Sequence, residues 1–170
     1  MGGLKPALRL DDVVELQARA LLRRYGIVFR RLLTREPNAA PWRELARVYR
    51  RLEARGDIRG GRFVNGMSGE QFALPEAVER MREVRRGAGD AALIVLSAAD
   101  PLNLTGIITP GERIRAAHTT RIAWRDGVPL SVMEGDYVRP LTDLAAEEAL
   151  TAAHALAGRR VAAGSGWVGR

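Results

Sequence analysis

Residues 41–74 read PWRELARVYRRLEARGDIRGGRFVNGMSGEQFAL and decide how the first half of the chain folds. Apolar side chains recur at helical spacing after Pro41, a favoured first-turn residue, and this pattern stops at Gly56. Two strand-like segments, residues 58–64 and 70–74, then flank a turn that is rich in Gly and Asn. The stretch therefore predicts a helix followed by a β-hairpin.

Further helical patterns lie on both sides of this stretch. One runs from residues 11–12, an Asp pair that offers an N-cap, to Tyr25, and a short one covers residues 30–36. Another begins at Pro75 and ends at Arg86. Three helices followed by a basic hairpin is the order of elements in a winged helix, which usually places its third helix in the major groove of DNA.

Arginine side chains gather on the third predicted helix and on the hairpin. Those of the helix lie three and four residues apart, so they project from one side, opposite the apolar stripe. The predicted DNA-binding residues are Arg43, Arg47, Arg50, Arg51, Arg59 and Arg62. The alternative is a merely solvated face on a winged helix that serves as a spacer or protein contact.

The excess of positive over negative charge is confined to the first half of the chain. Of the 27 basic residues, 26 are Arg and one is Lys5; residues 1–89 hold 19 basic and 11 acidic side chains, and residues 90–170 hold 8 and 9. GC-rich coding explains the preference for Arg over Lys, but it does not explain the asymmetry between a net +8 and a net −1. A basic half beside a neutral one favours a polyanion partner, and the lack of an amphipathic lipid anchor favours nucleic acid over membrane.

Composition excludes several other classes of protein. The 170 residues are 46% hydrophobic and 28% charged, which is typical of a soluble globular protein. No apolar run approaches the ~18 residues of a spanning helix, and no signal peptide is present, so we expect a cytoplasmic protein. Without Cys and with only His118 and His154, no metal site is expected. Lys5 follows Leu4, so a Walker A motif is absent and this chain carries no P-loop motor.

The second half has the shorter periods of strands. Residues 87–89 form a Gly-rich linker, and a final helix is predicted over residues 142–156. The predicted strands between them are residues 91–97, 105–109, 121–124, 128–133 and 137–139. An Asp-Gly turn joins residues 121–124 to residues 128–133 as a hairpin. We therefore predict an α+β protein with a winged-helix domain over 1–89 and a small β-barrel or bent sheet with a C-terminal helix and tail over 90–170.

Four runs of this sequence carry a family resemblance. RRYGIVFRRLLTRE, WRELARVYRRLEARGDIRGGRFVNGMSGEQFALPEAVERMR, SAADPLNLTGIITPG and RIAWRDGVPL resemble the extreme C-terminal region of the large helicase-related (Lhr) proteins, bacterial superfamily-2 DNA helicases with a long C-terminal extension. The extension is similar to a winged-helix array that ends in a β-barrel, as in AlkZ-type alkylpurine DNA glycosylases, and uracil-DNA glycosylase activity is associated with it.

The resemblance implies a DNA-repair fragment with the last winged helix and the barrel. DNA, an upstream helicase core and further winged helices of the same polypeptide would be its partners. ATP and Mg²⁺ would be bound by the upstream motor, no cofactor is expected in this chain, and the protein would be cytoplasmic and associated with the nucleoid.

A glycosylase would need a carboxylate or amide at the mouth of a dry pocket. Asp100 is the candidate, because it leaves an apolar run where burial would raise its pKa, and Asn103 follows as a polar orienting residue. The alternative is that Asp100, which precedes a proline, caps a turn. A second polar pair, Glu70 and Gln71, either contacts DNA or satisfies the hairpin backbone.

Three function classes remain open on the sequence. We favour a DNA-binding accessory module of an ATP-dependent Lhr-type repair helicase. The alternatives are the active-site module of a uracil or alkylpurine DNA glycosylase, and a winged-helix regulator or protein-interaction module without chemistry.

Overall fold

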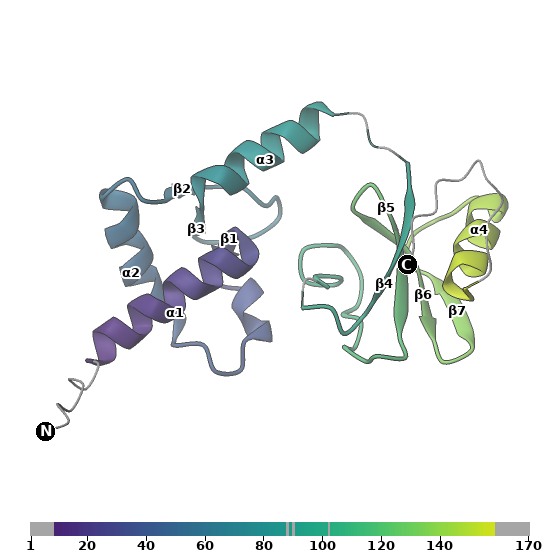
Figure 1. Cartoon of the computed structure of the whole chain (residues 1–170), viewed down its shortest axis with the longest axis horizontal. Coiled ribbons are helices and arrows are strands. Elements are labelled where there is room, and N and C mark those ends of the chain that lie inside the picture. Colours follow the sequence, from purple (N-terminus) through teal and green to yellow (C-terminus); the bar gives the residue numbers. More distant parts are fainter. Residues whose placement is uncertain (1–8, 88, 90, 102, 159–170) are drawn as a thin grey trace, which may run out of the picture. The chain divides into compact units, whose positions relative to one another are not determined.

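The computed structural model describes residues 9–87, 89, 91–101 and 103–158. The chain forms two compact units, residues 1–86 and 87–170 (Figure 1). That residues 1–89 and 90–170 are two separate domains stays a prediction. In the described residues, no helix combines the length and the hydropathy that a membrane span requires.

The first unit has the element order of a winged helix. Its elements are α1 (Leu10–Tyr25), β1 (Ile27–Phe29), a 3₁₀ helix η1 (Leu32–Arg35), α2 (Trp42–Ala54), β2 (Arg59–Gly61), β3 (Gln71–Ala73) and α3 (Pro75–Arg86). The three strands form an antiparallel sheet in the order β1-β3-β2, so the strand from the N-terminal half pairs with the second strand of the hairpin. This arrangement confirms the predicted winged helix, with α2 as its third helix.

The core of this unit lies between α2, α1 and the sheet. Tyr49 of α2 is fully buried, and its ring lies 5.3 Å from that of Phe72 in β3, while its hydroxyl donates a hydrogen bond of 3.2 Å to the carbonyl of Ala18 in α1. Burial raises the pKa of the Tyr49 hydroxyl, which therefore stays protonated. Leu45 and Leu52 fill the rest of the same helix face.

Local details of the first unit differ from the sequence prediction. The N-cap of α1 is Arg9, which makes no side-chain cap; Asp11 and Asp12 lie in the first turn, where carboxylates favour the positive end of the helix dipole. The second helix is a single 3₁₀ turn over Leu32–Arg35, shorter than the predicted residues 30–36. The hairpin strands are also shorter than predicted, since the wing residues between them do not pair.

The second unit is an open sheet covered by one helix. Its elements are β4 (Leu93–Ser97), β5 (Arg121–Arg125), β6 (Val128–Glu134), β7 (Tyr137–Pro140) and α4 (Ala146–Leu156). The strands are antiparallel in the order β4-β5-β6-β7, with a register shift between Ala123 and Trp124 that bends the sheet. In the part of the chain that is described, β4 and β7 do not pair. The bent-sheet alternative is therefore confirmed, and a closed barrel is wrong.

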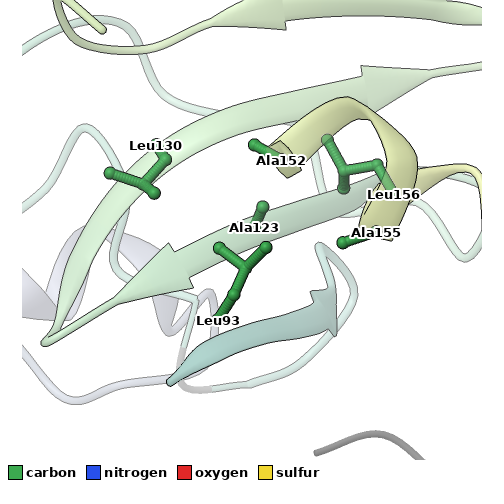
Figure 2. Packing of buried hydrophobic residues seen from close by; sticks show 6 residues of the cluster. All are labelled: Leu93, Ala123, Leu130, Ala152, Ala155 and Leu156. Carbon is green, nitrogen blue, oxygen red and sulfur yellow. The ribbon is translucent and has the colours of Figure 1, made fainter. Parts of the chain in front are cut away.

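Small side chains allow α4 to approach the sheet closely. Ala152, Ala155 and Leu156 of α4 face Ala123 and Leu130 of the sheet, and Leu93 completes the cluster (Figure 2). Arg125 of β5 also donates to the carboxylate of Glu148 in α4. The helix begins at residue 146 and not at residue 142 as predicted.

One predicted strand is wrong, and one predicted turn is confirmed. Residues 105–109 form turns, because Gly106 has a φ of +72° and the amide of Ile107 bonds the carbonyl of Leu104 at 2.9 Å. Ile107 is buried in these turns, and a buried turn segment has the same apolar composition as a buried strand. The Asp126-Gly127 turn between β5 and β6 has positive φ at both residues, as a type I′ turn requires.

Truncation of the α2 core residue Leu45 should destabilise the chain. Leu45 is fully buried, so Leu45→Ala should lower the free energy of unfolding by about 2–5 kcal/mol, measured by urea denaturation. Arg47→Ala on the exposed face of the same helix is the matched control and should change it by less than about 0.5 kcal/mol. Equal losses from both variants would show that Arg47 packs into the core.

Acid should weaken the contact between α1 and the end of η1. The carboxylate of Glu36 accepts hydrogen bonds of 2.6 Å from the Tyr25 hydroxyl and from Arg24, which lower the pKa of Glu36 from its ordinary 4.5. A lowered pKa in the folded state stabilises the fold above pH 4.5, and this contribution is lost as the pH falls through the folded-state pKa.

The pH dependence of unfolding tests this contact. Wild type should exceed Glu36→Gln in free energy of unfolding at neutral pH, and the difference should shrink below about pH 4.5. Tyr25→Phe, which removes one of the two donors, should narrow the difference. Parallel curves for wild type and Glu36→Gln across pH 3–7 would contradict the assignment.

Candidate nucleic-acid interface

The exposed face of α2 carries all four of its predicted DNA-binding residues. Arg43, Arg47, Arg50 and Arg51 are exposed, and at 3.6 residues per turn they fall within about 100° of arc. The opposite side of the helix is buried from Leu45 to Leu52. The amphipathic pattern therefore places four guanidinium groups on the solvent side of the helix.

Arg50 is committed to a partner within the same unit. Its Nε and Nη2 donate hydrogen bonds of 2.7 and 2.6 Å to the two carboxylate oxygens of Glu70, the residue before β3. These bonds raise the pKa of the Arg50 guanidinium and lower the pKa of the Glu70 carboxyl. Arg50 therefore joins α2 to the hairpin, a role that the helix spacing alone does not reveal.

The other three arginines of α2 differ in their pairing. Arg51 lies 3.6 Å from the carboxylate of Glu15 in α1. Arg43 and Arg47 form no ion pair within the described ranges, although both line a cleft of about 180 Å³ between α1 and α2 that also contains Asp11 and Glu44. Arg43 and Arg47 are thus the side chains of this face most available to a polyanion.

Gln71 holds the wing, which we define as residues 62–70. Its side chain is 1% exposed; its Oε1 accepts hydrogen bonds from the amides of Phe63 and Val64 at 2.9 and 2.8 Å, and its Nε2 donates to the carbonyls of Val64 and Met67 at 3.0 and 3.3 Å. Of the two alternatives for Glu70 and Gln71, the structure favours satisfaction of the hairpin backbone for Gln71, while Glu70 binds Arg50.

The hairpin arginines lie beside basic residues that the sequence reasoning missed. Arg59 lines a cleft of about 430 Å³ between β2 and α3, together with Arg82, and Arg62 lines a neighbouring cleft of about 270 Å³ with Arg82 and Arg85. All four guanidinium-bearing residues are exposed. The spacing of three between Arg82 and Arg85 on α3 is the same signal that identified the face of α2.

Asp100 and Asn103 lie in one tight turn after β4. The amide of Asn103 donates to the carbonyl of Asp100 at 2.9 Å, and its buried side chain donates to the carbonyl of Ala98 at 2.9 Å and accepts from the amide of Thr105 at 3.2 Å. These bonds make Asn103 an organiser of the turn backbone.

The same turn borders a small cleft in the second unit. Asp100, Asn103 and Trp124 line a space of about 100 Å³, together with Leu96, Ser97 and Ile122 of β4 and β5. The indole Nε1 of Trp124 is buried without a hydrogen-bond partner among the described residues. The described residues contain no cluster of His, Asp and Glu side chains suited to hold a metal ion.

Two comparisons with known proteins bear on this arrangement. Residues 9–93 match the family model described as large helicase-related protein, winged-helix domain. The chain is also 33% identical over 106 residues to the "Lhr helicase/uracil glycosylase" of Escherichia coli (strain K12), a match that covers 59% of this chain and 7% of that protein. The winged-helix topology of the first unit agrees with the matched domain. The chain therefore belongs to the large helicase-related family and carries its winged-helix domain over residues 9–93.

Proposed function

We propose that the chain is a DNA-binding accessory module of an ATP-dependent Lhr-type repair helicase. The observation that carries this proposal is the exposed pair Arg43 and Arg47, which has no ion pair in the described ranges and lies on the helix that winged helices place in the major groove. The net +8 of residues 1–89 adds long-range attraction to DNA. The motor that binds ATP and Mg²⁺ would belong to another part of such a polypeptide. The helicase would be associated with the nucleoid.

The proposal gives different roles to the arginines of α2. Arg43 and Arg47 contact backbone phosphates and release counterions, which supplies affinity without sequence preference. Arg50 positions the wing through Glu70, because its two donors already bind that carboxylate. Arg59 and Arg62 of the hairpin extend the contact to neighbouring phosphates.

Duplex-DNA binding by single variants tests this division of roles. Arg47→Ala should weaken binding to similar extents on different sequences and lower the slope of log K against log salt by about one, measured by fluorescence anisotropy. The matched control is Arg80→Ala, which removes the same charge at an exposed arginine of α3 that is paired with Glu83 at 3.0 Å, and it should leave the slope unchanged.

Two results would contradict the proposal. One is an unchanged salt slope for Arg47→Ala. The other is a stable dimer that protects one specific sequence, which would support a winged-helix regulator instead.

A second candidate function rests on the cleft of the second unit. Asp100 and Asn103 line it beside Trp124, whose buried Nε1 lacks a partner in the described residues, so polar groups meet apolar walls in a space of about 100 Å³. The similar Escherichia coli protein is named a uracil glycosylase as well as a helicase. We propose the active-site module of a DNA glycosylase as this alternative, with Asp100 activating water or stabilising an oxocarbenium ion and Asn103 orienting it.

Substitution of Asp100 distinguishes chemistry from a turn role. In a polypeptide with the complete C-terminal extension, Asp100→Asn should keep folding and DNA affinity but abolish excision of uracil if the carboxylate is catalytic. If Asp100 caps the turn, Asp100→Asn should excise uracil at the wild-type rate, and Asp100→Ala should cost about 1 kcal/mol of stability. Wild-type excision by a folded Asp100→Asn variant would remove Asp100 from the catalytic residues.

A further inference from the structure

The strongest unassigned feature is the groove between the hairpin and α3, called here the wing–α3 groove. Its two clefts, of about 430 and 270 Å³, share Phe63, Val78 and Arg82 and are therefore adjacent. One wall is β2 with the first wing residues, and the other is α3. This groove is separate from the arginine face of α2, since the clefts have no residue in common with the cleft between α1 and α2.

Charge in the wing–α3 groove favours an anion. Arg59, Arg62, Arg82 and Arg85 line it and form no ion pair with the residues that the structure describes, and Glu79 is the one carboxylate of its lining there. The neighbouring Glu83 on α3 is occupied by Arg80 at 3.0 Å. Four cations against one anion along a groove complement the backbone of a polyanion.

Apolar side chains also line the groove, and one of them is an aromatic ring. The half-buried Phe63 packs over Gly61, where a Cβ would lie 3.0 Å from the ring Cζ. On the facing helix, Met81 is 40% exposed, and α3 buries none of its residues. A ring between arginines matches the combination by which proteins bind single-stranded nucleic acid, with bases stacked on aromatic side chains and phosphates held by cations.

The backbone that carries the aromatic ring is held in place before any ligand binds. The amide of Phe63 donates 2.9 Å to the Oε1 of Gln71, and the next amide, of Val64, donates 2.8 Å to the same oxygen. Gln71 is fully buried within β3, so the wing backbone at Phe63 is fixed by the sheet. A fixed backbone under the ring lowers the ordering cost of binding a flexible strand.

We propose that the wing–α3 groove binds single-stranded DNA, with a base stacked on Phe63 and flanking phosphates on Arg59, Arg62, Arg82 and Arg85. Stacking on Phe63 needs the open face of a base, which a duplex buries between its neighbours, so the groove selects unpaired DNA. The inference rests on the proposed function in so far as both take DNA as the ligand. It differs in the form of DNA that is bound and in its use of Phe63 and α3, while Arg59 and Arg62 of the hairpin are common to both surfaces.

Anisotropy with two probes tests the groove on the full chain. The probes are a labelled oligothymidine of about 12 nucleotides and a mixed-sequence duplex of the same length. Phe63→Leu, which keeps an apolar side chain, should weaken oligothymidine binding by about 5-fold or more and leave duplex binding unchanged. Phe63→Trp, which keeps an aromatic ring, should retain oligothymidine binding. Thermal unfolding confirms that each variant folds.

Charge variants give a readout that does not depend on Phe63. Arg82→Ala with Arg85→Ala should lower the salt slope for oligothymidine by about 1.4, at about 0.7 per phosphate contact on a single strand, and leave the duplex slope unchanged. Arg80→Ala on the same helix is the matched control, because its guanidinium is paired with Glu83 and does not line the groove.

The outcomes separate this inference from the proposed function. Loss of duplex binding in Arg47→Ala together with unchanged oligothymidine binding in Phe63→Leu and in the Arg82, Arg85 double variant would overturn the groove and keep the α2 face. Equal weakening of both probes by the double variant would also overturn it, since the groove would then be a general electrostatic surface. Unchanged duplex binding in Arg47→Ala with selective loss of oligothymidine binding in the groove variants would keep the groove and overturn the α2 face.

Discussion

Burial of one face of α2 is the constraint on which the first unit depends. Leu45, Tyr49 and Leu52 are buried between α2, α1 and the sheet, and the Tyr49 hydroxyl donates to the carbonyl of Ala18. These contacts fix both the rotation of α2 about its axis and its position along that axis. The arginines point outward because the apolar residues occupy the inward side. The direction of the candidate DNA-binding face is thus a consequence of core packing.

A single buried amide has a comparable effect on the hairpin. The hairpin has little regular strand pairing, since β2 and β3 are three residues each and the wing lies between them. Gln71 replaces the missing ladder by bonding three wing residues, and the Arg50–Glu70 pair joins the wing base to α2 from the solvent side. The hairpin that forms one wall of the wing–α3 groove is thus also joined to α2, the helix that carries the other surface we propose for DNA.

In the second unit, close helix-to-sheet packing and a compact turn take the place of a barrel. Alanines at positions 123, 152 and 155 let α4 lie close to the bent sheet, and the helix thereby covers the apolar face that a barrel would have enclosed. Gly106, whose Cβ would lie 2.5 Å from the backbone of Arg113, lets residues 105–109 fold back as turns. Those residues therefore add no strand to the sheet.

The sequence by itself determined the winged helix, the arginine face of α2, the Asp-Gly hairpin and the helix over residues 75–86, because each follows from local spacing or turn chemistry. Only the tertiary structure decided that the second sheet stays open and that residues 105–109 are turns, since a buried apolar run has the same composition in both. It also decided which arginines are paired: Arg50 and Glu70 are 20 residues apart and Arg51 and Glu15 are 36 apart, and chain folding alone brings such pairs together. The wing–α3 groove likewise joins residues from two elements, so no local pattern contains it.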